Sequence, residues 1–278
     1  MPTAASGSRL AVHRSRLAVG GWRLAIDRAQ QARYHCHMSQ CRNCQATLDD
    51  AYCASCGQRD IDLERPIWDL VRELAHETFE LDGRAALTIR TLFQSPGKLT
   101  CEFLAGRRRS YTSPLRLYLV ISISFFILVA WFASSGILLD PGQDPGFDAA
   151  VQAGFLANDL PRLMFVLLPV FALLLKALFW NRLYFDHLIF SLHLHSAAYV
   201  LFAVLLAIQM LADQNLALLL LQGLGLAALI TYFVVALHRV YRPTWFAVAW
   251  KSTAMIFAYL VVVSIAIENT SSLLIIAD

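Results

Sequence analysis

Four cysteines near the start of the chain have the spacing of a metal site. They lie in the stretch CRNCQATLDDAYCASCG, as C-x2-C, eight intervening residues and a second C-x2-C, and are Cys41, Cys44, Cys53 and Cys56. Each C-x2-C turn brings two thiolates close enough to share one ion, and four thiolates complete a tetrahedral zinc shell with no open position for catalysis. The pattern therefore predicts a structural Zn²⁺ ribbon, in which Asp49 and Asp50 provide the turn between two short arms.

The alternative for these cysteines is a pair of disulfides, which would require an oxidising compartment. A module this small cannot bury enough apolar surface to fold alone, so a bound metal would supply folding free energy on the order of 10 kcal/mol. The distribution of basic residues along the chain places the module in the reducing cytoplasm. That placement favours zinc.

A second set of residues that could do chemistry lies inside an apolar stretch, 185–211. Its polar members are Asp186, His187, Ser191, His193 and His195. At helical spacing His187, Ser191 and His195 form one stripe, whereas Asp186 and His193 lie on another face. Ionisable side chains at membrane depth are candidate proton relays or metal ligands. The alternative is structural, because neutral histidines also hydrogen-bond between helices.

No sequence motif assigns a reaction to this candidate intramembrane polar site. A catalytic zinc would need a third protein ligand, for which His238 and Glu268 are available in the sequence but are not placed by it. The chain has no HExxH, G-x-S-x-G or P-loop pattern, so hydrolase and nucleotide-driven classes have no positive support.

The elements that position both sites are predicted to be membrane helices. The chain is 58% hydrophobic and 15% charged, far from the average of soluble proteins, in which about a quarter of the residues are charged. Five stretches approach or exceed the roughly 20 helical residues that cross a bilayer, and none alternates as a barrel strand would. They are 115–139, 160–180, 185–211, 216–237 and 245–267. We therefore expect an all-α polytopic membrane protein.

The loop charges predict the orientation of these spans. Basic residues collect on one side of the membrane, at Arg107, Arg108, Arg109, Arg116, Lys176, Arg182, Arg239, Arg242 and Lys251. The predicted opposite side has Arg162 as its basic residue, among several aspartates. Because basic loops stay inside, we expect a multi-pass protein of the inner (cytoplasmic) membrane with its N-terminus in the cytoplasm and its C-terminus outside. The net charge of +3 gives no reason to expect a nucleic acid partner.

Composition divides the chain into four regions. We expect an Arg-rich disordered extension over 1–37, with Met38 as an alternative start, the zinc ribbon over 38–60, an amphipathic connector over 61–113 and the bundle over 114–278. In the connector, Leu87, Leu92 and Phe93 continue an apolar face, so its helices should lie among the headgroups or cover the cytoplasmic end of the bundle. Two roles are open for Arg107, Arg108 and Arg109. They would bind anionic lipid headgroups, or they would act as the positive-inside signal that orients the first span.

Several motifs carry a resemblance to a known family. They are the double C-x2-C ending in CGQ, TIRTLFQSPGKLTCEFLAGRRRSYTSP, FDHLIFSLHLHS and ALHRVYRPTW. Over about residues 41–250 the chain resembles the bacterial membrane proteins grouped as domain-of-unknown-function family 3667, although Gln45 stands where a glycine is expected. The resemblance implies a helical membrane protein that carries a zinc ribbon, and it implies no reaction.

The residues lead to two hypotheses about function. The first is a non-enzymatic anchor, adaptor or sensor in the lipid bilayer, whose cytoplasmic zinc ribbon binds a protein partner. The second is a transporter of a small solute, protons or a metal, or an intramembrane enzyme, that uses the polar residues of the third span. The packing around His187 and His195 separates them, because a water-filled cavity favours the second and dry packing the first. The oligomeric state is open in both.

Overall fold

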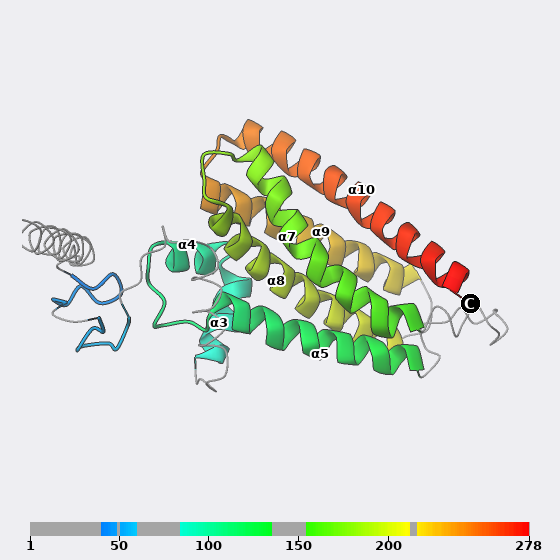
Figure 1. Ribbon diagram of the computed structural model, residues 1–278, viewed down its shortest axis with the longest axis horizontal. Helices are drawn as coiled ribbons and strands as arrows, with labels where there is room; N and C mark the ends of the chain where they lie inside the picture. The colour runs from blue at the N-terminus through cyan, green and yellow to red at the C-terminus, as the bar shows by residue number, and fades with distance from the viewer. Residues whose placement is uncertain (1–39, 49–50, 60–83, 135–153, 212–215, 278) are drawn as a thin grey trace, which may run out of the picture. The chain divides into compact units, whose positions relative to one another are not determined.

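The computed structural model describes residues 40–48, 51–59, 84–134, 154–211 and 216–277. The chain divides into two compact units, Met1–Ile61 and Asp62–Asp278. The first contains the cysteine cluster, with two isolated antiparallel β-bridges, Gln40↔Thr47 and Tyr52↔Arg59. The described part of the second unit is helical (Figure 1).

Five helices of the second unit are long and apolar enough to cross a membrane, which confirms the predicted all-α polytopic class. They are α5 (Pro114–Ser134), α7 (Leu160–Leu178) preceded by the π-helical turn η2 (Phe155–Asp159), α8 (Tyr184–Leu211), α9 (Leu216–Tyr241) and α10 (Trp245–Ala277). The last two extend past the predicted ends at 237 and 267. Residues 135–139, at the end of the first predicted span, lie outside the described residues.

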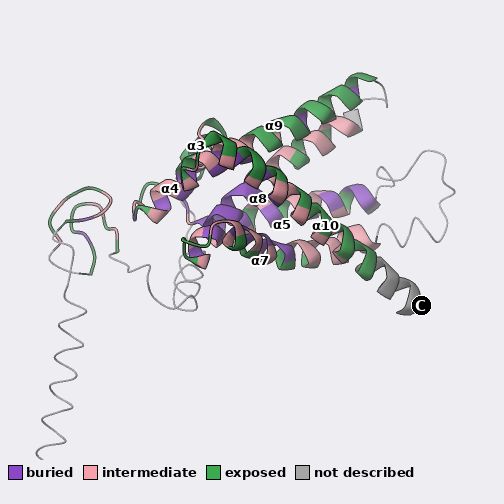
Figure 2. Ribbon diagram, turned by 90° about the horizontal axis from the view of Figure 1, so that it is seen from above, coloured by how far each residue is buried: buried purple, intermediate pink, exposed green. Residues whose placement is uncertain are grey.

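Helix α8 is the centre of the bundle. Of the membrane-spanning part of α8, 56% is buried in the protein, against 17% for α9 and for α10. The burial colours of Figure 2 show the same contrast, with α8 largely purple and the outer helices largely green. Helices α5 and α7 pack along most of α8, and α9 closes another side. The polar residues of the third span are therefore on the helix with the least access to lipid.

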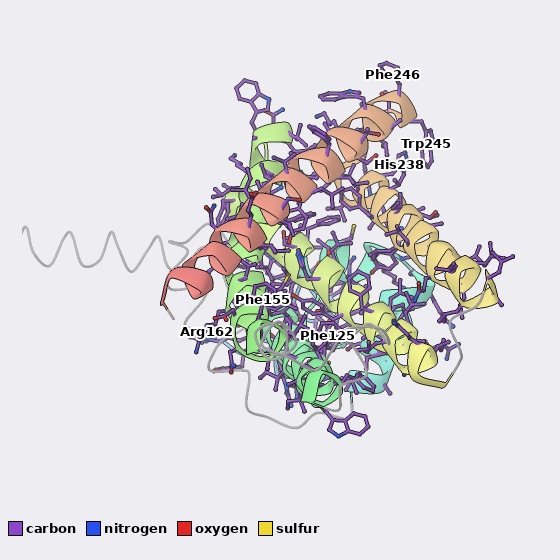
Figure 3. All side chains as sticks on the ribbon, turned by 90° about the vertical axis from the view of Figure 1, so that its right-hand side faces the viewer. Phe125, Phe155, Arg162, His238, Trp245 and Phe246 are labelled. Carbon is purple, nitrogen blue, oxygen red and sulfur yellow. The ribbon has the colours of Figure 1, made fainter. Side chains whose placement is uncertain are left out.

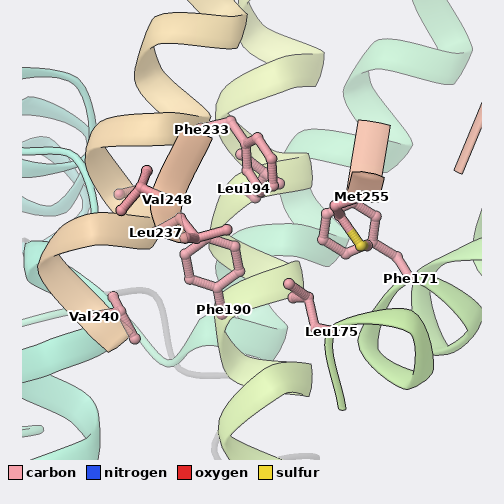
Figure 4. Packing of buried hydrophobic residues seen from close by; sticks show 10 residues of the cluster. Phe171, Leu175, Phe190, Leu194, Phe233, Leu237, Val240, Val248 and Met255 are labelled. Atoms are coloured by element: carbon pink, nitrogen blue, oxygen red, sulfur yellow. The ribbon is translucent and has the colours of Figure 1, made fainter. Parts of the chain in front are cut away.

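Two apolar clusters hold the bundle together. The larger joins α7, α8, α9 and α10 and is drawn in Figure 4; it contains Phe171, Leu175, Phe190, Leu194, Phe233, Ala236, Leu237, Val240, Val248 and Met255. In the smaller, Leu92 and Leu99 meet Leu117 of α5 and Ala197 of α8. Because lipid tails are as apolar as these side chains, close packing rather than exclusion of water stabilises such contacts.

Two short helices, α3 (Ala85–Gln94) and α4 (Lys98–Leu104), form a hairpin against the bundle. Figure 1 shows them at the end where α5 and α8 begin and α9 finishes. The buried residues of α3 are Thr88, Thr91 and Leu92, whereas Leu87 and Phe93 are exposed. Of the predicted apolar face, Leu92 therefore contacts the bundle, and the placement of Leu87 and Phe93 among headgroups stays a prediction. The threonines turn inward because Thr88 Oγ1 donates to the Arg84 carbonyl oxygen at 2.8 Å and contacts Thr112.

Candidate metal centre and the polar contacts of the bundle

The cysteine cluster is built from two copies of one local fold. In the first, the N–H of Gln45 donates to the Cys41 carbonyl at 2.9 Å and the N–H of Cys41 donates to the Ala46 carbonyl at 2.7 Å. Twelve residues later, the same two bonds run from Gly57 to Cys53 and from Cys53 to Gln58, both at 2.8 Å. Each copy is closed by one of the two β-bridges. Both C-x2-C turns thus present their cysteines in the same way.

The position after each C-x2-C turn requires left-handed backbone. Gly57 has φ +69°, and Gln45 has φ +66° at the equivalent place. Glycine adopts this conformation without a steric penalty, whereas a residue with a Cβ loses about 1–2 kcal/mol. The departure from the family pattern at Gln45 therefore leaves the geometry of the first turn unchanged and makes it a strained copy of the second.

The four sulfur atoms fit a single tetrahedral ion. All lie within 4.8 Å of one another, with Cys41 Sγ 3.7 Å from Cys56 Sγ and Cys44 Sγ 3.6 Å from Cys53 Sγ. Ligands about 2.3 Å from a shared zinc lie about 3.8 Å apart at tetrahedral angles, whereas a disulfide joins sulfurs at about 2.05 Å. The four cysteines therefore form a group that could hold a metal ion, and the sulfur–sulfur distances suit ligands of one shared ion rather than two disulfides.

Backbone groups around the sulfurs favour thiolates. The Asn43 N–H donates to Cys41 Sγ at 3.4 Å. At Cys53 a hydrogen bond from the Cys56 backbone, opposed by burial and helped by the Ser55 backbone, lowers the pKa of the thiol to about 7. Burial raises the pKa of the Cys56 thiol to about 11. A cation bound among the four sulfurs would stabilise the thiolate at Cys56, because metal ligation deprotonates a thiol.

The histidines of α8 contact three different helices. His187 is fully buried, and its Nδ1 is hydrogen-bonded to the Tyr241 hydroxyl of α9 at 2.7 Å. Its ring also stacks on Tyr241, with the ring planes 13° apart. The Nε2 atom is buried without a hydrogen bond of ordinary geometry in the described residues, although the Phe179 carbonyl lies near the ring.

His195 is held from two sides. Its Nδ1–H donates to the Ser191 carbonyl at 2.8 Å, since a carbonyl oxygen can only accept. The Nε2 atom is then free to accept from the Tyr259 hydroxyl of α10, 3.1 Å away. Ser191 in turn donates to the His187 carbonyl at 2.8 Å. Within the described residues each side chain of the predicted stripe therefore has a hydrogen-bond partner in the packed bundle, and Nε2 of His187 is the atom left without one.

The other two residues of the predicted polar site point elsewhere. His193 Nδ1 is hydrogen-bonded to Thr100 Oγ1 of α4 at 3.0 Å, in a buried contact. Asp186 Oδ2 lies 4.0 Å from the guanidinium of Arg182. His238, a potential third metal ligand, stacks on Trp245 with ring centroids 4.0 Å apart. Throughout the described residues, the cysteine cluster is the group found to suit a metal ion.

The arginine cluster after α4 is partly engaged within the protein. Arg107 forms a two-bond ion pair with Glu102, one bond being 2.9 Å long, and this pairing lowers the pKa of the Glu102 carboxyl. The Arg108 guanidinium lies over the Phe103 ring, 4.7 Å from its centroid. The carbonyl of Arg109 accepts a hydrogen bond from Arg84. The role predicted for these three arginines at lipid headgroups stays a prediction.

Residues 82–126 match the model of a family described as "Protein of unknown function (DUF3667)". The predicted resemblance to this family, made for about residues 41–250, is confirmed over these residues. The matched segment of DUF3667 contains α3, α4 and the first half of α5, and so coincides with the docked hairpin. No curated protein and no solved structure matched the chain.

The structure explains the glycines in two specific motifs of the DUF3667 segment. In PGK, Gly97 has φ +77°, and a Cβ there would lie 2.9 Å from the Ala236 carbonyl oxygen of α9. In GRRRSY, Gly106 has φ +82° and lies just after the end of α4. Its N–H donates to the Phe103 carbonyl, and the backbone N–H of Arg107 donates to the Glu102 carbonyl. The first motif fits the hairpin against α9, and the second turns the chain toward α5.

Sequence reasoning missed the residues that hold this hairpin in place. The Tyr232 hydroxyl donates to the Leu92 carbonyl at 3.0 Å, and Arg239 Nη1 donates to the Pro96 carbonyl at 2.7 Å. The tyrosine partners of the histidines, Tyr241 and Tyr259, were also missed. Their one sequence signal is a polar hydroxyl within an apolar span, where a hydrogen-bond partner is expected.

Proposed function

We propose that this protein is a non-enzymatic anchor in the cytoplasmic membrane whose zinc ribbon binds a protein partner in the cytoplasm, as an adaptor or sensor. The observation that carries the proposal is the cluster of four sulfurs at tetrahedral spacing. Four thiolate ligands leave zinc no open coordination position for a substrate. The metal would then stabilise the fold of the small ribbon, and the surface of the ribbon would bind the partner.

The orientation rests on the basic residues. The antiparallel order of α5, α7, α8, α9 and α10 brings the start of α5, the α7–α8 turn and the α9–α10 turn to one end of the bundle (Figure 1). Lys176 and Arg182 belong to the first of those turns, and Arg242 and Lys251 flank the second. The positive-inside rule supports placing this end in the cytoplasm, together with the N-terminus.

One face of the ribbon suits a protein partner. Tyr52 is 58% exposed in the second bridge, and the guanidinium of Arg59 lies 5.9 Å from the centre of its ring. Tyrosine and arginine are the residues that most often dominate the free energy of protein interfaces. An exposed tyrosine on a metal-stapled turn is also preorganised, so little conformational entropy is lost on binding.

Metal analysis and capture with matched variants test the proposal. The purified wild type is expected to contain about one zinc per chain, and Cys53→Ser should lose the metal and the partner while keeping its abundance in the membrane. Cys101→Ser is the control, because Cys101 lies in α4 and should retain both. Tyr52→Ala should keep the zinc but lose the partner. Absence of metal in the wild type, or zinc retained by Cys53→Ser, would refute the metal site.

A second function keeps one observation in its favour, the buried Nε2 of His187. An intramembrane relay or transport site would use this atom, and His187→Leu would then abolish function at normal abundance. If His187 is structural, the same change lowers stability by about 1–2 kcal/mol and reduces abundance in proportion. Rescue of a deletion phenotype, scored beside the membrane abundance of the variant, separates the two roles.

A further inference from the structure

A group of cations at one corner of the bundle has no role in the proposed ribbon function. It is formed by the α7–α8 turn and the two sides of the α9–α10 turn, and consists of Lys176, Arg182, Arg239, Arg242 and Lys251. Two acids lie near it. Asp186 faces Arg182 at 4.0 Å, and Glu102 is already bound by Arg107. The corner therefore carries a clear excess of positive charge.

Three of these cations lie near enough to Cys101 of α4 to act on its thiol. Burial raises the pKa of the Cys101 thiol, and the charges of Arg239, Arg242 and Arg182 oppose that rise. The thiol itself lies 3.8 Å from the Arg239 carbonyl oxygen. Arginines from the α7–α8 turn, the end of α9 and the α9–α10 turn thus converge beside α4, although they are far apart in the sequence.

The cations differ in how far they are used within the protein. Lys176 Nζ donates to two carbonyls after α7, and Lys251 Nζ donates to the Leu178 carbonyl at 2.7 Å. Both lysines therefore cap the end of α7. The side chain of Arg182 has long contacts in the part of the chain that the structure describes, 3.5 Å to the Val240 carbonyl and 4.0 Å to Asp186. The exposed side chain of Arg242 makes no hydrogen bond or ion pair within the described residues.

Exposed aromatic side chains place this corner at the depth of the lipid headgroups. Trp180 is 77% exposed, Trp245 is 63% exposed and Phe246 is 83% exposed. Figure 3 shows Trp245 and Phe246 projecting outward from the start of α10. Tryptophans concentrate at the membrane–water interface, with their rings among the headgroups. With those rings among the headgroups, the guanidiniums of Arg182 and Arg242 beside them would lie at the level of the lipid phosphates.

We propose that Arg182 and Arg242, assisted by Arg239, bind the phosphate of an anionic phospholipid headgroup at this corner. A guanidinium presents paired N–H donors that match two phosphate oxygens, and basic pockets between membrane helices on the cytoplasmic side favour anionic headgroups. The exposed apolar rings of Trp245 and Phe246 provide a surface for the attached acyl chains, which favours a lipid over free phosphate.

Native mass spectrometry of the purified full chain, titrated with phosphatidylglycerol or phosphatidylcholine, tests this site. The wild type should retain phosphatidylglycerol and bind it more tightly than phosphatidylcholine. A surface cation contributes about a fivefold gain in affinity, so Arg182→Gln with Arg242→Gln should weaken phosphatidylglycerol binding about 25-fold. The control is Arg162→Gln, since Arg162 is exposed, pairs with Asp159 and lies away from Trp245 in Figure 3. It should leave binding unchanged.

Three outcomes overturn the proposal. They are equal binding of the two lipids by the wild type, unchanged phosphatidylglycerol affinity in the double variant, and displacement of the lipid by inorganic phosphate at equal concentration. If the double variant does not fold, Arg242→Gln alone carries the test, with about a fivefold loss expected. The exposed side chain of Arg242 makes no hydrogen bond or ion pair with another described element. Zinc content should be unchanged in every variant, which separates this site from the ribbon.

Discussion

Replacement of Gly97 by alanine should undock the α3–α4 hairpin from α9. A Cβ at this position would lie 2.9 Å from the carbonyl oxygen and 3.1 Å from the Cα of Ala236, and 3.2 Å from Cγ2 of Val240. The two nearest atoms belong to the backbone of a long helix, so they cannot move aside as a flexible side chain could. Gly97 also has φ +77°, where any residue with a Cβ is strained.

The cost follows from these two effects. Left-handed backbone costs a non-glycine residue about 1–2 kcal/mol, and overpacking a close contact costs about 1–3 kcal/mol. Alanine restricts the unfolded chain, which returns about 0.4–1 kcal/mol. The expected net loss is about 1–5 kcal/mol in the free energy of unfolding. Lifting the hairpin would also break the Tyr232 bond to the Leu92 carbonyl and the Arg239 bond to the Pro96 carbonyl.

Two other glycines provide controls within the same chain. A Cβ on Gly223 of α9 meets nothing within 4 Å, so Gly223→Ala should be neutral or stabilise the helix by up to about 1 kcal/mol. A Cβ on Gly225 would lie 2.7 Å from Cδ1 of Leu205, the end of a side chain that can change rotamer. Gly225→Ala should therefore cost less than Gly97→Ala.

Equilibrium unfolding in mixed micelles with increasing denaturing detergent, followed by circular dichroism, measures the three variants against the wild type. Accessibility of Cys101 to a thiol reagent reports separately on the hairpin, because α4 carries Cys101 against α9. The expected order of stability is Gly223→Ala, then Gly225→Ala, then Gly97→Ala. Wild-type stability and unchanged Cys101 labelling in Gly97→Ala would refute the docking of the hairpin on α9.

Three further results are expected. Gln45→Gly should raise zinc affinity by up to about tenfold in a chelator competition, because φ +66° no longer strains a side chain; weaker binding would contradict this. A double-mutant cycle of Thr100→Val and His193→Leu should give a coupling of about 0.6–1.7 kcal/mol, and no coupling would mean that their 3.0 Å contact is not formed. Because Arg107 lowers the pKa of Glu102, the pair stabilises the protein above pH 4.5 and this is lost as pH falls through the lowered pKa. Glu102→Gln should therefore be less stable than wild type near neutral pH, by less than about 1 kcal/mol for so exposed a pair, and the gap in melting temperature should close in acid. A gap independent of pH would exclude the ion pair as its cause.

The main elements could be predicted from the sequence because each rests on a strong local signal. Five apolar stretches of membrane length and two C-x2-C turns need no knowledge of the rest of the fold. The ends of the helices were harder to predict from the sequence. Helix α9 continues to Tyr241 because Val240 is buried against the bundle and Tyr241 bonds His187, and both contacts are tertiary. Charged and aromatic residues at 238–241 made the same segment resemble a loop.

Helix α3 shows how a pattern can predict a helix and its apolar face without telling what each residue of that face contacts. Apolar periodicity placed Leu87, Leu92 and Phe93 on one face, to meet either the headgroups or the bundle. Leu92 is buried, whereas Leu87 and Phe93 are exposed and threonines face inward. In water this would be unfavourable, but at a membrane surface the outer environment is itself apolar. A hydrogen-bonded Thr88 between the Arg84 carbonyl and Thr112 then suits the protein side. Hydrophobicity alone therefore cannot tell which side of an interfacial helix meets lipid.

For the polar residues of α8, too, the sequence predicted the shared face but not the neighbours that each residue contacts. Helical spacing correctly grouped His187, Ser191 and His195, because that spacing depends on one helix only. It could not assign their neighbours, which come from the ends and middles of other spans. His187 bonds Tyr241 of α9, and His195 bonds Tyr259 of α10. A catalytic or metal site requires several such groups to converge on one point, whereas here the two histidines are hydrogen-bonded to different helices and Ser191 to the backbone of α8 itself. The stripe thus adds polar contacts between α8 and the two helices that also meet it in the apolar cluster, and this arrangement favours a structural role for the histidines.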